Sequence, residues 1–124
     1  MSGQDELGPC HVLVVEDELL IALDLCGKLE VMGCTPIGPA ASVEDALALI
    51  DSCHPDIALL DENLGGAPAT PVAEALRRRH IPFAVVSGYT RERSVLREAP
   101  RIGKPATTEI VRDMVRRLRW PVRR

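Results

Sequence analysis

The alternation of apolar runs with helical patterns is the feature that most constrains how this chain can fold. Continuous apolar runs predict strands at residues 11–16, 35–38, 55–61, 81–88 and 100–103. The segments between them place apolar residues at helical spacing, and they predict helices at 18–32, from 42 onwards, from 70 onwards and at 107–120. Strands that are apolar throughout are buried on both faces. The sequence therefore predicts an α/β fold with a doubly wound, five-stranded parallel sheet.

Two of the predicted helices carry start signals. Ser42 is a capping residue, and Asp45 stands three residues later, where the two can interact. Thr70 followed by Pro71 gives a second capping residue with a proline at the first helical position.

The segment 88–99 has the weakest helical pattern in the chain. Only Val95 and Leu96 can form a packing face in it. Because helix stability comes mainly from burying an apolar face, we expect a short or weakly formed fourth helix here.

Length and composition fit one compact domain. The chain has 124 residues, of which 46% are hydrophobic, which is enough to bury a core. We expect the domain at 10–120, with flexible tails at 1–9 and 121–124. No window approaches the roughly 18 consecutive apolar residues of a membrane span, and the N-terminus lacks the features of a signal peptide. These observations predict a cytoplasmic protein that does not engage a membrane.

Charge and cysteine content narrow the classes of partner further. A formal net charge of -3 argues against a general nucleic-acid binder, and we interpret the basic "VRRLRWPVRR" as a solvated helix face and tail. The sequence contains no C-x-x-C pair, and its cysteines lie mostly among apolar neighbours. We interpret them as small core residues in a reducing compartment. They are Cys10, Cys26, Cys34 and Cys53.

Carboxylates stand at the ends of two predicted strands. Asp61 ends the third strand, and Glu16 and Asp17 end the first. In an open parallel sheet, ligands collect at the carboxyl ends of the strands. If these strands are neighbours, three carboxylates converge on one pocket, where their mutual repulsion favours a bound divalent cation.

Two further polar residues end strands on the same edge. Ser87 follows "FAVV" and offers a hydroxyl, and Lys104 follows the fifth strand and precedes a proline. A metal, a nucleophilic carboxylate, a hydroxyl and an ammonium together suit phosphoryl transfer, because that chemistry chiefly needs positioning and neutralisation of charge.

The order of these residues resembles that of a known family. The acidic pair in "VVEDE", the "LLDENLGG" turn, the "VVSG" strand end and the "KP" step resemble the receiver domain of two-component response regulators, over nearly the whole chain. "IPFAVVSGY" is also similar to the FAT GUY subgroup, although Val85, Val86 and Ser87 stand at the A-T part of that pattern. The resemblance implies a flavodoxin-like receiver fold with strand order 2-1-3-4-5, and the family often has a cis bond at the Lys-Pro step.

The resemblance also implies roles for individual residues. Asp61 would accept a phosphoryl group from the phosphohistidine of a sensor histidine kinase. A Mg²⁺ or Mn²⁺ ion would be held by Asp17, Asp61 and the backbone carbonyl of Asn63, with Glu16 acting largely through water. The Ser87 hydroxyl and the Lys104 ammonium would bind the phosphoryl oxygens.

One position departs from the family pattern. Most receivers carry Phe or Tyr three residues before the lysine, and this ring changes position on phosphorylation. Here that position is Arg101. Tyr89, two residues after Ser87, is the natural substitute, and plain packing beneath a short loop is the alternative interpretation of its ring.

Three functions remain open at this point. We favour a single-domain phosphoacceptor, not an enzyme, that binds an unknown downstream protein when phosphorylated or drains phosphate from a shared kinase; a homodimer is compatible with it. The second is a degenerate receiver that serves only as a protein-interaction module. The third is a small-molecule binder such as a flavodoxin, but "VVEDELL" after the first strand is acidic, the wrong sign for a phosphate loop without a metal. A P-loop is excluded because no G-x-x-x-x-G-K-[ST] occurs.

Overall fold

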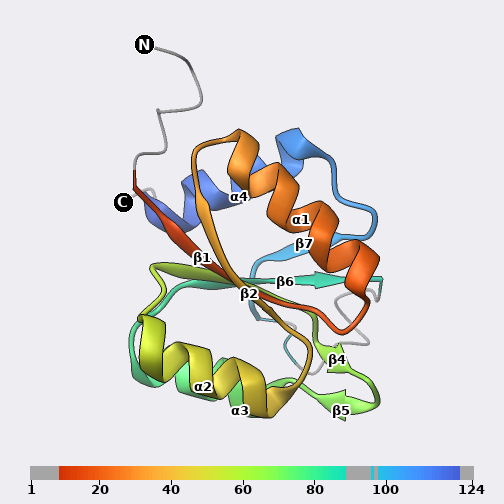
Figure 1. The fold of residues 1–124 in the computed structure, drawn as a ribbon, viewed down its shortest axis with the longest axis vertical. Helices are drawn as coiled ribbons and strands as arrows, with labels where there is room; N and C mark the ends of the chain where they lie inside the picture. Colours follow the sequence, from red (N-terminus) through yellow and green to blue (C-terminus); the bar gives the residue numbers. More distant parts are fainter. Residues whose placement is uncertain (1–8, 89–95, 97, 121–124) are drawn as a thin grey trace.

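The computed structural model describes residues 9–88, 96 and 98–120, and five parallel strands form its central sheet. The strands are β1 (His11–Val15), β2 (Thr35–Ala40), β3 (Ile57–Leu60), β6 (Phe83–Ser87) and β7 (Arg101–Gly103). Their order across the sheet is β2-β1-β3-β6-β7 (Figure 1). Counted within this sheet alone, that is the predicted order 2-1-3-4-5, and the doubly wound prediction is confirmed.

Helices cover both faces of the sheet. On one face lie α1 (Leu19–Val31) and α4 (Thr108–Arg119), and on the other lie α2 (Val43–Cys53) and α3 (Thr70–Arg78) (Figure 1). Along β1, Val12 and Val14 belong to the core beneath α1 and α4, whereas Leu13 and Val15 belong to the core beneath α2 and α3. Successive strand residues point to opposite faces, so a strand with two cores must be apolar throughout.

The predicted start of α2 is confirmed, but that of α3 is wrong by one residue. Ser42 Oγ accepts a hydrogen bond from Asp45 N at 3.1 Å. In α3 the N-cap is Ala69, because its carbonyl is the first to accept intrahelical bonds, from Val72 N and Ala73 N. Thr70 is therefore already helical, and the proline after it stands second, where its missing N–H still costs no hydrogen bond.

A small hairpin that no sequence pattern predicted lies between β3 and α3. Strands β4 (Asn63–Leu64) and β5 (Ala67–Pro68) pair antiparallel. The two residues between them, Gly65 and Gly66, have φ of 61° and 92°, the left-handed values that a tight two-residue hairpin turn requires. Strands of two residues are too short to show a periodic pattern.

The cysteine interpretation needs one correction. Cys10, Cys26 and Cys34 are buried, but Cys53, the last residue of α2, is exposed and does not belong to the core. The predicted weak fourth helix, with Tyr89, lies largely outside the described residues, as do residues 1–8 of the predicted tail at 1–9 and the whole predicted tail at 121–124. No helix in the described part of the chain is both long and apolar enough to cross a membrane.

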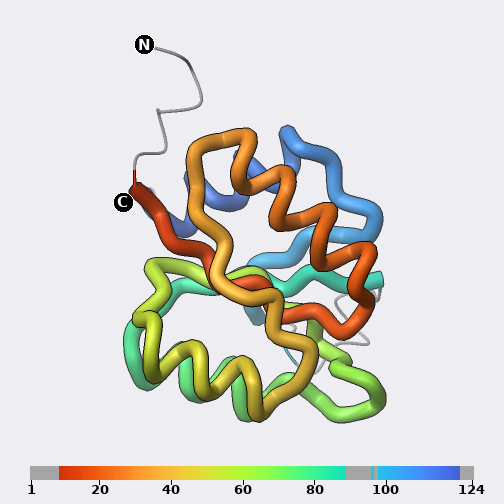
Figure 2. The backbone as a smooth tube through the Cα atoms, viewed as in Figure 1, coloured from red at the N-terminus to blue at the C-terminus, as the bar shows by residue number. Residues whose placement is uncertain are grey.

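The two ends of the described chain lie side by side. The backbone enters β1 next to the end of α4, where Arg119 Nη2 donates to Pro9 O at 3.1 Å (Figure 2).

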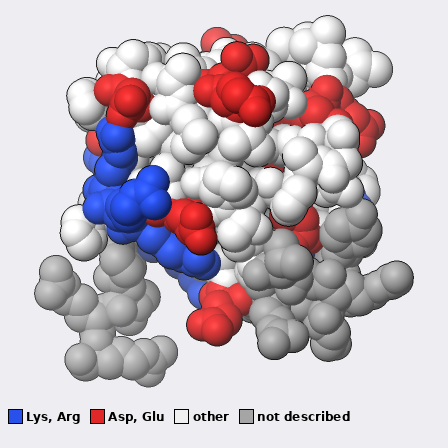
Figure 3. Space-filling view, turned by 90° about the horizontal axis from the view of Figure 1, so that it is seen from below, with Lys and Arg blue, Asp and Glu red and all other residues white. Residues whose placement is uncertain are grey.

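Seen from the side of α2 and α3, basic side chains form a band at one side of the molecule (Figure 3). The last turn of α3 carries Arg77 and Arg78, where positive charge suits the helix dipole.

Candidate functional site

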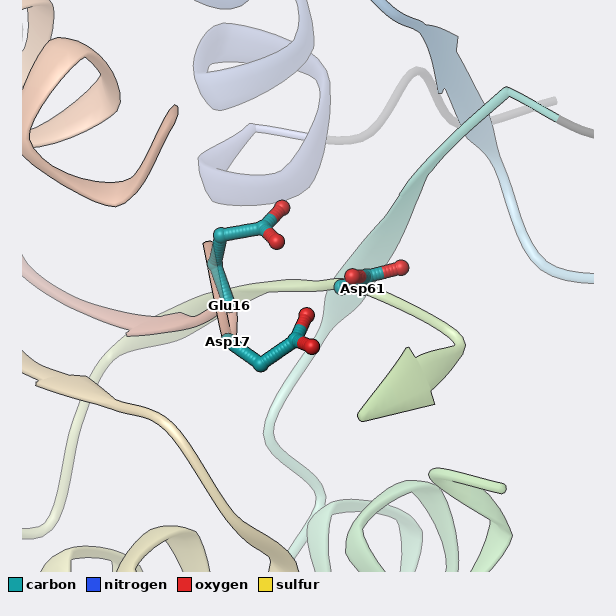
Figure 4. Close-up of side chains that lie close together, drawn as sticks. All are labelled: Glu16, Asp17 and Asp61. Atoms are coloured by element: carbon teal, nitrogen blue, oxygen red, sulfur yellow. The ribbon is translucent and has the colours of Figure 1, made fainter. Parts of the chain in front are cut away.

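The three predicted carboxylates meet at the carboxyl ends of the two central strands. Glu16 and Asp17 follow β1 directly, and Asp61 follows β3 directly. Val15 and Leu60 are paired in the sheet, so the residues after them emerge side by side. One carboxylate oxygen from each of the three acids lies within 4.8 Å of the others (Figure 4). Neighbouring parallel strands therefore position the cluster, as the sequence predicted.

Burial makes this cluster costly for the fold. Glu16 is 1% exposed and Asp61 7%, whereas Asp17 is exposed to solvent. Burial and the nearby Glu16 charge raise the pKa of Asp61 from 3.8 to about 7, against smaller opposing effects of the Asn63 backbone N–H and of Lys104. Near neutral pH, without a cation, the cluster therefore holds a proton that an exposed aspartate would release.

Lys104 supplies a positive charge at the same place. It follows β7, its bond to Pro105 is cis, and its Nζ lies 2.9 Å from Glu16 Oε1 and 3.4 Å from Asp61 Oδ2. Burial alone would lower the pKa of Lys104, but its contacts with Glu16 and Asp61 outweigh that effect and raise it. The ammonium thus stays charged and bridges two of the three carboxylates.

A solvent-open pocket of about 350 Å³ lies over the cluster. Asn63 stands at its wall: its backbone N–H faces Asp61 Oδ1 at 3.3 Å, and its side-chain oxygen accepts from Gly66 N at 3.0 Å. The residues around the pocket come from the ends of four strands of the sheet and from the β4–β5 hairpin. They are Asp17, Glu18, Asp61, Asn63, Gly65, Gly66, Ser87, Gly88 and Lys104. Every predicted site residue lines this pocket except Glu16, which lies beneath it.

Ser87 reaches the pocket, but its hydroxyl is bonded to a residue that the sequence analysis left out of the site. Ser87 Oγ donates to Glu62 Oε1 at 2.5 Å, and Arg101 Nη1 lies 3.3 Å from the same oxygen. Glu62 is only 4% exposed. The sequence offered two signals for this contact. A second acid stands directly after Asp61, and an arginine stands at the position where the family carries an aromatic residue.

The donor set fits a divalent cation such as Mg²⁺. Hard cations prefer oxygen ligands, and the cluster offers three carboxylates beside a solvent-open pocket. Glu16 Oε1 is buried and, apart from the ion pair with Lys104, no aligned hydrogen-bond donor faces it among the described residues. A cation, or a water bound to one, would satisfy that oxygen and offset the repulsion among the acids.

Comparison with known proteins gives relatives for the chain. No protein-family model matches it. Over 80 residues it is 42% identical to the positive alginate biosynthesis regulatory protein of Pseudomonas aeruginosa, a match that covers 61% of this chain and 32% of that protein. The chain thus spans about a third of the length of that relative.

Solved structures match the chain over nearly its whole length. SdrG from Sphingomonas melonis Fr1 is 40% identical with a TM-score of 0.78, over 95% of this chain and 98% of that one. The response regulator PhyR from Brucella abortus is 28% identical with a TM-score of 0.79, over 89% of this chain and 47% of that one. This chain is therefore similar to both proteins in sequence and in fold.

Proposed function

We propose a phosphoacceptor function for this chain, which belongs to the receiver domains of response regulators. Asp61 is the acceptor, and the donor is the phosphohistidine of a sensor histidine kinase. The observation that carries the proposal is the meeting of Glu16, Asp17 and Asp61 with Lys104 beneath an open pocket. Phosphoryl transfer needs this combination of a carboxylate nucleophile and neutralising charge.

The geometry suggests how each residue contributes to the transfer. A carboxylate oxygen of Asp61 forms a bond to phosphorus while the nitrogen–phosphorus bond of the donor breaks. Lys104, already 3.4 Å from Asp61, neutralises charge on the phosphoryl oxygens. Asp17, Asp61 and the backbone carbonyl of Asn63 would hold Mg²⁺ or Mn²⁺, with Glu16 beneath them. The cation, when bound, supplies charge neutralisation and lowers the pKa of the acceptor carboxyl.

The partners follow from this chemistry. Besides the kinase, a downstream protein would bind the phosphorylated form, or the chain would act as a phosphate sink. We place it in the bacterial cytoplasm, where such kinases hold their phosphohistidines, and we regard it as assisting its own phosphorylation and dephosphorylation rather than as an enzyme. The alternative, a degenerate receiver that only binds proteins, would not require Asp61, Lys104 and the acidic pair to lie together.

Phosphorylation from a small donor tests the proposal. Incubated with acetyl phosphate and Mg²⁺, the protein is expected to gain one phosphoryl group in intact-protein mass spectrometry, and none when EDTA replaces Mg²⁺. Asp61→Asn is expected to gain none, because an amide oxygen is a poor nucleophile. Asp113→Asn, at an exposed position on α4, is the matched control and should behave as the wild type.

Equal uptake by the Asp61→Asn variant would remove the assignment of the acceptor. A folded wild-type protein that gains no phosphoryl group under any of these conditions would favour the degenerate receiver.

A further inference from the structure

Glu62 is a buried acid at the pocket that the proposed phosphoryl transfer does not use. It follows Asp61 directly, yet its carboxylate faces Ser87 and Arg101 rather than the three acids of the cation site. Its side chain is 3% exposed, and that of Arg101 is 11% exposed. Burying a carboxylate is unfavourable unless it is paired and hydrogen-bonded, so both contacts stabilise Glu62 in place.

The Ser87 hydroxyl has one proton and two competing acceptors. In this structure the proton is donated to Glu62 Oε1 over 2.5 Å, a short hydrogen bond to a charged group. The role that the resemblance to receiver domains implies for Ser87 requires the same proton to be donated to a phosphoryl oxygen on Asp61. A hydroxyl can make only one of these donations at a time.

From this competition we infer that Glu62 is a positioning residue which holds Ser87 in the unphosphorylated state and opposes its transfer to the phosphoryl group. The inference rests on the proposed function. How strongly the phosphorylated state is favoured then depends on the balance between two acceptors of the Ser87 proton, Glu62 and the phosphoryl group. The presence of Ser87 alone does not determine it.

Arg101 has the opposite effect in the same cluster. When Ser87 turns to the phosphoryl group, Glu62 loses a hydrogen bond but keeps Arg101 Nη1, which lies 3.3 Å from the shared oxygen. The guanidinium therefore limits the cost of releasing Ser87, since the buried carboxylate is not left without a cation. This gives a reason for an arginine at the position where most receivers carry an aromatic ring.

The placement of Arg101 connects the cluster to the surface of the sheet. Arg101 begins β7, which is the edge strand, and it pairs in the sheet with Val85 of β6. Ser87 ends the neighbouring strand β6, and Glu62 lies two residues beyond the end of β3, the next strand inward. The ion pair of Arg101 with Glu62 therefore links the cluster to the edge strand of the sheet.

Two substitutions are expected to change ligand affinity in opposite directions. The probe is beryllofluoride, a phosphoryl mimic, titrated in the presence of Mg²⁺ by calorimetry. Glu62→Gln replaces a charge-assisted hydrogen bond by a neutral one, and it should tighten beryllofluoride binding by roughly tenfold. Arg101→Gln leaves Glu62 more dependent on Ser87, and it should weaken binding by roughly tenfold.

A double-mutant cycle isolates the role of Ser87. In a Ser87→Ala background, Glu62→Gln should no longer change the affinity. Glu44→Gln, at an exposed position of α2, is the matched control and should bind as the wild type does. If Glu62→Gln does not fold because the buried charge of Arg101 is then less well neutralised, the variant carrying both Glu62→Gln and Arg101→Gln should bind more tightly than Arg101→Gln alone.

The outcomes separate this inference from the proposed function. Shifts in the same direction for both single variants, or a Glu62→Gln effect that persists without Ser87, would overturn the positioning role while leaving Asp61 as acceptor. A wild-type protein that does not bind beryllofluoride would overturn both.

Discussion

Magnesium is expected to raise the melting temperature of this protein by about 10 °C, and Asp17→Asn is expected to lose most of that rise. A ligand that binds only the folded state adds about 2.7 kcal/mol at a concentration one hundred times its dissociation constant. For a domain of this size, each kcal/mol shifts the melting temperature by roughly 4 °C. Asp17 is the exposed member of the carboxylate cluster, and replacing it removes a charged ligand.

Thermal unfolding followed by circular dichroism, in EDTA and in a Mg²⁺ series, measures this effect. Asp113→Asn removes one exposed acid far along the chain on α4 and should keep the full response. The cation site would be misassigned if Asp17→Asn and Asp113→Asn gained the same number of degrees.

The metal-free protein is expected to lose stability as the pH rises from about 4 to above 7, and Asp61→Asn should abolish this part of the loss. The pKa of Asp61 is about 7 in the folded protein against an ordinary value of 3.8, for reasons of burial first and the Glu16 charge second. Between these two values the folded state binds more protons than the unfolded state, so its stability falls with rising pH. A shift of this size corresponds to at most about 4 kcal/mol.

Denaturant unfolding in EDTA at several pH values between 4 and 8 is the measurement. The free energy of unfolding of Asp61→Asn, minus that of the wild type, should grow with pH and level off above pH 7. Taking the difference cancels the titration of the shared groups that do not interact with Asp61. The raised pKa of Lys104 affects stability only near and above its ordinary value of 10.5, outside this range. A difference that stays flat with pH would show that Asp61 ionises as an exposed aspartate does.

Strand ends were predictable from the sequence because they follow from local composition. Asp61 is the first polar residue after an apolar run, and Lys104 directly follows a short predicted strand. A parallel sheet brings the ends of all its strands to one edge. Burial of β3 on both faces made its apolar run the clearest, and the meeting of the carboxylate that follows it with Glu16 and Asp17 was therefore predictable.

Side-chain partners were not predictable in the same way. The Ser87 hydroxyl is expected to bind phosphoryl oxygens on Asp61, whereas its donation to the buried Glu62 carboxylate in this structure was not predicted. That choice depends on which way Glu62 turns at the end of β3. The β4–β5 hairpin and the one-residue error at Thr70 have the same origin, since a few backbone hydrogen bonds decide them rather than a periodic pattern.

The ion pairs of Lys104 also determine what a binding partner can sense. With all groups ionised, three carboxylates against one ammonium leave two negative charges at the cluster, which a divalent cation would cancel. A phosphoryl group on Asp61 would then add back only about one negative charge, and at physiological ionic strength such a charge is screened beyond about 8 Å. The electrostatic field around the molecule would therefore change little if Asp61 were phosphorylated. A partner protein would have to discriminate the two states by the shape of the sheet edge, and its preference for one state should be nearly independent of salt concentration.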